Sequence, residues 1–164
     1  MKKVLIFVLA PIFLSNTEEG RISNELITFN PIKEVVVEQP IILPPKRIDD
    51  LVNALIYVES RGIDSAIGDR HLKEPSVGVL QIRPIMVREV NRICKKKGLE
   101  ERFTLKDRFD RKKSIHMFMI WKGYYHKDSN FEAISRSWNG GPRWRKLKRT
   151  EKYWAKVEQQ LNNN

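Results

Sequence analysis

The segment from Asp50 to Glu59 constrains the fold most, because it combines helical spacing of apolar residues with an acidic residue in the same stripe. A helix turns by about 100° per residue, which places four apolar side chains on one face: Leu51, Val52, Leu55 and Ile56. Glu59 falls on that face too. Burial of the stripe removes the Glu59 carboxyl from water and favours its neutral form. A carboxylic acid that keeps its proton at neutral pH is suited to general acid catalysis.

A plainer interpretation of Glu59 stands beside this one. A glutamate in the last turn of an amphipathic helix can reach solvent, or it can pair with a nearby cation such as Arg61. The helical pattern alone favours this plainer interpretation. Evidence from other segments is needed to choose between them.

The N-terminus indicates export. Met1-Lys2-Lys3 and the apolar run of residues 4–14 resemble the start of a signal peptide, and the run is too short to span a bilayer as a helix. Residues 1–17 are therefore predicted to be a signal peptide or an N-terminal anchor. This predicts a periplasmic or extracellular protein, either released or held at the inner membrane by residues 4–14. Because no clear small-x-small cleavage site follows the run, retention of the segment and the absence of export stay open.

Residues 18–46 are predicted to be an extended linker, and residues 47–164 the folded domain. Three prolines, Pro40, Pro44 and Pro45, suit a semi-rigid spacer, and residues 34–38 are compatible with a single strand. The remaining residues are enough for one domain with its own core.

The formal net charge of +11 favours an anionic partner. The basic residues are scattered, and no zinc-finger, basic-zipper or RNA-binding motif is present, so we expect no specific nucleic acid partner. The charge would also concentrate an exported, monomeric protein on an anionic cell envelope. A basic, non-catalytic protein that binds envelope glycans or nucleic acid remains the alternative.

The rest of the domain is predicted to be mainly α. Helices are expected to begin near Asp49 or Asp50 as N-cap, at Pro84, near Asp110, after Asn130 and at Thr150. Gly62 and Gly98 are expected to lie just past the ends of the first two helices. The third helix is predicted to turn Ile115, Phe118, Met119 and Tyr125 or one of its neighbours inward. The last is predicted to bring Tyr153, Trp154, Val157 and Leu161 to the core.

Other kinds of catalytic site find little support in the sequence. His71, His116 and His126 have no metal-ligand spacing, and no glycine-rich loop has a phosphate-binding form. No Gly-x-Ser-x-Gly elbow is present. Cys94, the single cysteine, is predicted to be a core residue. We therefore expect no metal and no cofactor.

Three segments in order resemble a known family. They are Glu59-Ser60 at a helix end, Gly78-Val79-Leu80-Gln81-Ile82, and Trp138-Asn139-Gly140-Gly141. The chain from about Ile48 to Leu161 is similar to the soluble lytic transglycosylase (SLT) family of the lysozyme-like superfamily. That family carries Glu-Ser, Gly-Leu-Met-Gln-Ile and Ala-Tyr-Asn-Ala-Gly at these places. The three segments together favour the catalytic interpretation of Glu59.

The resemblance implies a goose-type/SLT helical domain with a groove for peptidoglycan glycan strands. Glu59 would be the single general acid and base, cleaving the β-1,4 bond between N-acetylmuramic acid (MurNAc) and N-acetylglucosamine (GlcNAc) and leaving a 1,6-anhydro end. Such an enzyme would serve the cell envelope, a secretion system or a phage.

The same resemblance assigns substrate binding to six further residues. Gln81 and Asn139 would hydrogen-bond sugar groups, Gly78 would let the backbone approach the sugar, and Ser60 and Ser76 would lie near the acid. Trp138 would offer its ring to a sugar face or its indole N–H to Glu59. Each residue also has a structural interpretation: a turn at Gly78, a backbone cap at Gln81, core packing at Trp138.

The chain departs from the family pattern in three places. Trp138 replaces a tyrosine whose hydroxyl would hydrogen-bond the acid, and Leu80 replaces a methionine. Residues 61–77 form a long, charged loop that includes Asp64 and Asp69. Either aspartate could activate a water molecule, which would make the protein a goose-type-like lysozyme that hydrolyses the same bond with inversion.

Overall fold

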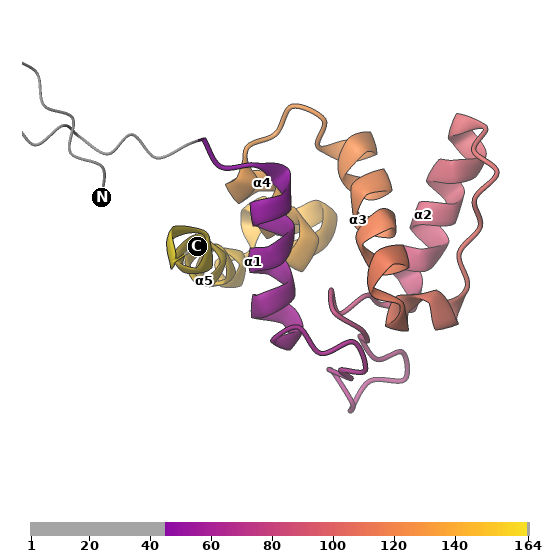
Figure 1. The fold of residues 1–164 in the computed structure, drawn as a ribbon, viewed down its shortest axis with the longest axis horizontal. Helices are drawn as coiled ribbons and strands as arrows, with labels where there is room; N and C mark the ends of the chain where they lie inside the picture. The colour runs from indigo at the N-terminus through magenta and orange to yellow at the C-terminus, as the bar shows by residue number, and fades with distance from the viewer. Residues whose placement is uncertain (1–44, 164) are drawn as a thin grey trace, which may run out of the picture. The chain divides into compact units, whose positions relative to one another are not determined.

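The computed structural model describes residues 45–163, and helices account for most of them (Figure 1). The elements follow in the order α1 (Ile48–Ser60), α2 (Pro84–Lys97), η1 (Leu105–Phe109), α3 (Arg111–Tyr125), α4 (Phe131–Gly140), η2 (Gly141–Lys146) and α5 (Arg149–Asn163), where η denotes a 3₁₀ helix. Extended pairing in this part of the chain is limited to two isolated β-bridges. The predicted mainly α class is confirmed for these residues.

Several N-terminal predictions lie outside the described residues. They are the signal peptide or anchor of residues 1–17, the strand at 34–38 and nearly all of the linker at 18–46. Between residues 45 and 163, no helix has both the length and the apolar character that a membrane crossing requires.

Local signals set most of the helix ends. Asp110 caps α3 by accepting a hydrogen bond from Lys113 N at 2.9 Å, and Asn130 caps α4 by accepting one from Ala133 N at 2.9 Å. Gly98 ends α2 in the left-handed conformation at φ 69°. These predicted ends are confirmed.

The predicted N-cap of α1 is wrong. Arg47 occupies the cap position, and Asp50 is the third helical residue, whose carboxylate accepts a hydrogen bond from Arg47 N at 2.6 Å. Asp50 is therefore not the N-cap. It is the N3 residue of a capping box, and its carboxylate accepts a hydrogen bond from the backbone amide of the N-cap residue.

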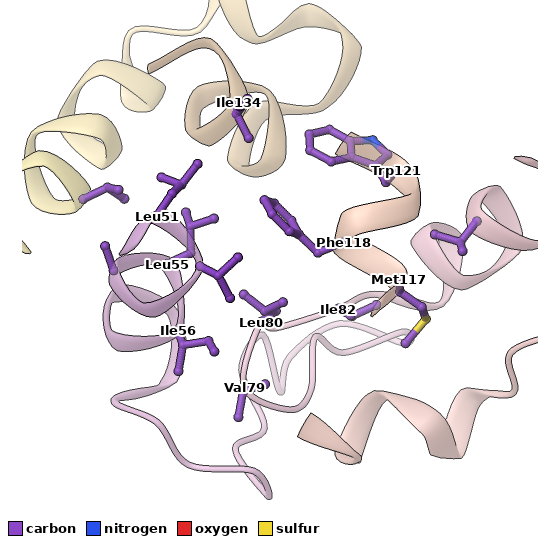
Figure 2. Packing of buried hydrophobic residues seen from close by; sticks show 14 of the residues in the cluster. Leu51, Leu55, Ile56, Val79, Leu80, Ile82, Met117, Phe118, Trp121 and Ile134 are labelled. Carbon is purple, nitrogen blue, oxygen red and sulfur yellow. The ribbon is translucent and has the colours of Figure 1, made fainter. Parts of the chain in front are cut away.

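The core lies where the five α-helices meet the loop between α1 and α2, and Figure 2 shows the part of it formed around α1, α3 and the loop. Leu51 and Leu55 of α1 face Phe118 of α3 and Ile134 of α4, and all four side chains are essentially inaccessible to solvent. Each such burial contributes roughly 1.5–3 kcal/mol relative to exposure. Cys94 also lies in this core, as predicted. The buried stripe of α1 fixes the helix, and with it the position of Glu59.

The inward face predicted for α3 is confirmed at Phe118 and at Ile115, which packs partly buried against the core, and is wrong at its other positions. Met119 and Tyr125 of α3 are exposed, whereas Met117 and Trp121 are buried beside Phe118. Residues 117–121 are all apolar, so within this run the sequence does not distinguish the inner face of the helix from the outer face. Packing of α3 against α2 and η1 decides the face instead.

The loop between α1 and α2 is anchored to the core by its own apolar residues. Val79 and Leu80 belong to this loop, and both side chains are fully buried in the core. Its backbone folds back on itself through bridges between Ile67 and Val77 and between Val77 and Ile82. Burial of Val79 and Leu80 therefore holds the neighbouring polar residues of the loop at a fixed place at the end of α1.

Buried Arg108 of η1 stabilises this loop by hydrogen bonds to its backbone. Its Nη1 donates to Pro75 O at 3.3 Å and to Ile82 O at 3.1 Å. A buried guanidinium needs several acceptors to offset its desolvation, and these carbonyls supply them. The same contacts tie both ends of the segment 75–82 to η1.

Candidate functional site

Glu59 opens onto a cleft of about 550 Å³ at the C-terminal end of α1. Its side chain is half-buried, because α1 turns the apolar stripe that contains it toward the core. Two further groups of residues line the cleft. One comes from the loop and the start of α2, and the other from α4, η2 and the first residue of α5. The cleft therefore forms where three parts of the chain meet beside Glu59.

Tyr153 of α5 holds the Glu59 carboxyl. Its hydroxyl donates to Glu59 Oε1 at 2.7 Å, across 94 residues of sequence. Tyr153 is buried, and α5 packs directly against α1. Burial and the Glu59 carboxylate raise the pKa of Tyr153 well above its ordinary value, so the phenol stays a donor.

The sequence predicted Tyr153 only as a core residue. The one available signal was that a buried tyrosine usually finds a partner for its hydroxyl. That signal does not identify the partner. The hydroxyl that contacts Glu59 thus comes from α5, and not from the end of α4.

The pKa of Glu59 is raised from 4.5 to about 7. Desolvation by burial is the main cause, and the negative charge of Asp69 adds to it. The hydrogen bond from Tyr153 acts in the opposite direction, because it stabilises the carboxylate. Near neutral pH, Glu59 can therefore both give and take a proton.

The loop places Gln81, Ser76 and Asp69 in the cleft as one hydrogen-bonded group. Ser76 Oγ lies 3.0 Å from Gln81 Oε1 and 3.2 Å from Asp69 Oδ2, and its single proton can serve one of them at a time. Gln81 Nε2 donates to Gly78 O at 2.9 Å. Gln81 is thus fixed by the loop while it lines the cleft.

Trp138 and Asn139 line the cleft from the end of α4. The Trp138 ring packs edge-on against Phe118 and Trp121, each at a centroid distance of 5.1 Å. The hydrogen bond to Glu59 comes from Tyr153, whereas Trp138 combines core packing with an edge toward the cleft. Asn139 Oδ1 accepts a hydrogen bond from Arg149 Nη1 at 3.0 Å.

Ser60 and Gly78 support the cleft but do not line it. Ser60 Oγ is within hydrogen-bond distance of Ile56 O, at 3.1 Å, and of Val79 O, at 2.9 Å, and so joins α1 to the loop. Gly78 has φ 78°, and a Cβ atom there would lie 1.8 Å from Arg108 O. Gly78 therefore lets the chain approach η1, and it is not among the residues that line the cleft.

The two loop aspartates have different surroundings. Asp64 forms an ion pair with Arg111, with Oδ1 at 2.9 Å from Nη2, and it does not line the cleft. Asp69 lines the cleft and raises the pKa of Glu59. Of the two carboxylates considered for water activation, only Asp69 shares the cleft with Glu59.

A second cavity of about 470 Å³ continues from the cleft. The two share Ile85, Met86 and Gly141, and the second is lined by aromatic residues that include Trp121 and Trp144. An extended ligand in the cleft would therefore meet a largely apolar, aromatic surface next to Glu59.

Replacing Tyr153 with phenylalanine tests the contact to Glu59. Loss of the donor destabilises the carboxylate, so we expect the pKa of Glu59 to move to higher pH, together with the alkaline limb of any reaction that requires protonated Glu59. The rate below that limb should fall about tenfold as the carboxyl loses its fixed orientation. Tyr57→Phe, on the exposed side of α1, is the matched control and should change neither. An unchanged alkaline limb in Tyr153→Phe would show that the contact does not tune the acid.

The cleft offers acid and base chemistry on a polar ligand. Within residues 45–163, no three His, Cys, Asp or Glu side chains are grouped so that they could hold a metal ion. Of the three histidines, His126 is buried against Trp121, while His71 and His116 are exposed.

Comparison of the chain with models of protein families and with curated proteins finds no match.

Proposed function

We propose that the chain is a peptidoglycan lytic transglycosylase with a lysozyme-like helical domain. The observation that carries the proposal is the half-buried Glu59 carboxyl, with a pKa of about 7, at the centre of a cleft of about 550 Å³. The order of the three motif segments in the sequence supports the same activity. The substrate is a glycan strand of alternating GlcNAc and MurNAc.

In the first step, neutral Glu59 donates its proton to the glycosidic oxygen between MurNAc and GlcNAc. The C1–O bond breaks, the GlcNAc side leaves as an alcohol, and positive charge develops at C1 of MurNAc. The acetamido group of the substrate can stabilise this centre. Tyr153 then stabilises the Glu59 carboxylate through its hydrogen bond.

In the second step, the Glu59 carboxylate acts as a base. It takes the proton of the MurNAc C6 hydroxyl as that oxygen forms a bond to C1, which gives a 1,6-anhydro end and returns Glu59 to its neutral form. The attacking oxygen belongs to the substrate, so no second carboxylate is needed as a nucleophile. One acid with a pKa near 7 suffices for both transfers.

The remaining motif residues divide into two groups under this proposal. Ser76, Gln81, Trp138 and Asn139 contact the sugars, because they line the cleft. Ser60 and Gly78 act indirectly, by holding the loop that carries Gln81. The aromatic cavity beyond Met86 would take sugar units further along the strand.

A goose-type-like hydrolase is the second candidate, and the position of Asp69 favours it. Asp69 shares the cleft with Glu59, so it could activate a water molecule that attacks C1 from the opposite face. The product would then carry a reducing end instead of an anhydro end.

Mass spectrometry of the muropeptides released from purified peptidoglycan separates the two chemistries. We expect 1,6-anhydro-MurNAc ends, whose mass is lower by one water than that of reducing ends. Reducing ends that disappear in Asp69→Asn would establish the hydrolase instead. No released product, together with strong and salt-sensitive binding of duplex DNA, would favour a non-catalytic basic protein. The proposed enzyme acts outside the cytoplasm, on the cell's own envelope or for secretion or phage machinery.

A further inference from the structure

Arg149 brings a positive charge to the cleft that no carboxylate in residues 45–163 neutralises. It is the first residue of α5 and lines the cleft together with residues of α4 and η2. Its Nη1 donates to Asn139 Oδ1 at 3.0 Å and to Asn139 O at 3.4 Å. Arg83, the other arginine that lines the cleft, also forms no ion pair within residues 45–163, but its Nε donates to Glu74 O at 3.3 Å.

The contact between Arg149 and Asn139 leaves only hydrogen-bond donors free. A guanidinium has no acceptor, and its Nε and Nη2 have no partner within residues 45–163. Asn139 uses its amide oxygen to accept from Arg149, so the free part of its side chain is the NH₂ group. Two adjacent residues of the cleft thus present N–H groups and a positive charge.

A ligand group that matches this arrangement is an acceptor with negative charge. Sugar hydroxyls and acetamido groups carry no charge, and they both donate and accept. A carboxylate accepts through both oxygens, and its hydrogen bonds with a guanidinium are stronger than those between neutral groups. The substrate of the proposed function carries carboxylates close to the scissile bond, on the lactyl group of MurNAc or on the stem peptide attached to it.

We propose that Arg149, together with Asn139, binds a carboxylate on the MurNAc side chain and so makes the cleft selective for peptidoglycan over uncharged GlcNAc polymers. This inference rests on the proposed function and adds the chemical feature by which the strand is recognised. Arg149 acts in binding, whereas Glu59 carries the proton transfers.

The test uses the full chain with Glu59→Gln, so that ligands are bound without being cut. Four tetrasaccharide probes are titrated by calorimetry. They are chitotetraose, a GlcNAc-MurNAc tetrasaccharide with free lactyl carboxylates, the same compound with its carboxylates converted to methylamides, and the same compound carrying stem peptides. We expect at least one carboxylate-bearing probe to bind about tenfold more tightly than chitotetraose and the methylamide. Preference for the free lactyl compound identifies the lactyl carboxylate, and preference for the peptide compound alone identifies the stem peptide.

Arg149→Gln, added to Glu59→Gln, should remove this preference and leave chitotetraose binding unchanged. Arg149→Lys keeps the charge without the planar fork and should retain part of the preference. Arg143→Gln, an exposed cation of η2 outside the cleft, is the matched control for net charge and should retain all of it. Equal weakening of all probes in Arg149→Gln, or equal affinity of all probes before substitution, would overturn the inference while the proposed function stands. Binding of none of the probes would overturn both.

Discussion

Replacing Glu59 with glutamine is expected to abolish lysis of purified peptidoglycan. Glutamine has nearly the same shape and can still accept the hydrogen bond from Tyr153, but it can neither give nor take a proton. General acid and base catalysis by one side chain typically accounts for about 10²- to 10⁴-fold of a rate, and in the proposed mechanism Glu59 serves both steps. Release of soluble muropeptides over time measures the loss.

The same substitution is expected to stabilise the fold at alkaline pH. The pKa of Glu59 is 4.5 when unperturbed and about 7 in the folded protein, so between these values the folded state holds a proton that the unfolded chain releases. The free energy of unfolding therefore falls as pH rises through this range. One pKa unit corresponds to about 1.4 kcal/mol, and the two values differ by about 2.5 units, so the loss is on the order of 3 kcal/mol by pH 8.

Glu59→Gln lacks this loss, because its amide does not titrate. Its free energy of unfolding should exceed that of the native protein by this amount at pH 8, and the two should agree near pH 4. Urea denaturation across this pH range provides the measurement. Glu158→Gln, on the exposed side of α5, is the control and should change neither stability nor activity. Full lytic activity in Glu59→Gln, or the same pH dependence of stability, would contradict the assignment of Glu59.

Most of the helical fold is encoded in signals that act within a few residues. Asp110, Asn130, Pro84 and Gly98 each define a helix end through their own backbone or side-chain preference, and the sequence is enough to find them. The two 3₁₀ helices were not predicted. Each has only five or six residues, and its conformation depends on the segments that it touches, such as the approach of Gly78 to Arg108.

The site was predictable to the extent that it depends on one helix. The carboxyl of Glu59 follows from the stripe of α1, but its partner Tyr153 depends on how α1 packs against α5. Arg149 and Asn139 likewise meet only after α4 and α5 are placed. Ser60 illustrates the opposite case, because the motif resemblance placed it among the substrate-binding residues, whereas its hydroxyl joins α1 to Val79.

Replacing Gly78 with alanine is expected to be the most destabilising substitution in the loop. The residue has φ 78°, and the added Cβ would lie 1.8 Å from Arg108 O and 2.9 Å from Arg108 C. Both atoms belong to the backbone, so the clash can be relieved only by moving η1 away from the loop. Arg108 also donates to Pro75 O and Ile82 O, and such a movement would weaken these contacts. We expect a loss on the order of 4 kcal/mol in the free energy of unfolding, from strain and overpacking together.

Gly98→Ala separates these two causes. Gly98 has φ 69°, yet no atom lies within 4 Å of the Cβ that alanine would add, so this variant carries the backbone strain without the clash. It should lose only about 1 kcal/mol, because a left-handed conformation costs roughly that much for alanine. Urea denaturation of both variants gives the difference, and the steric share at Gly78 is the excess over Gly98. A similar loss in both would mean that the loop does not approach η1 so closely, in which case Gly78 would be free to face a ligand after all. A large excess, with lytic activity lost in the folded fraction of Gly78→Ala, would show that the approach to Arg108 is what holds Gln81 in the cleft.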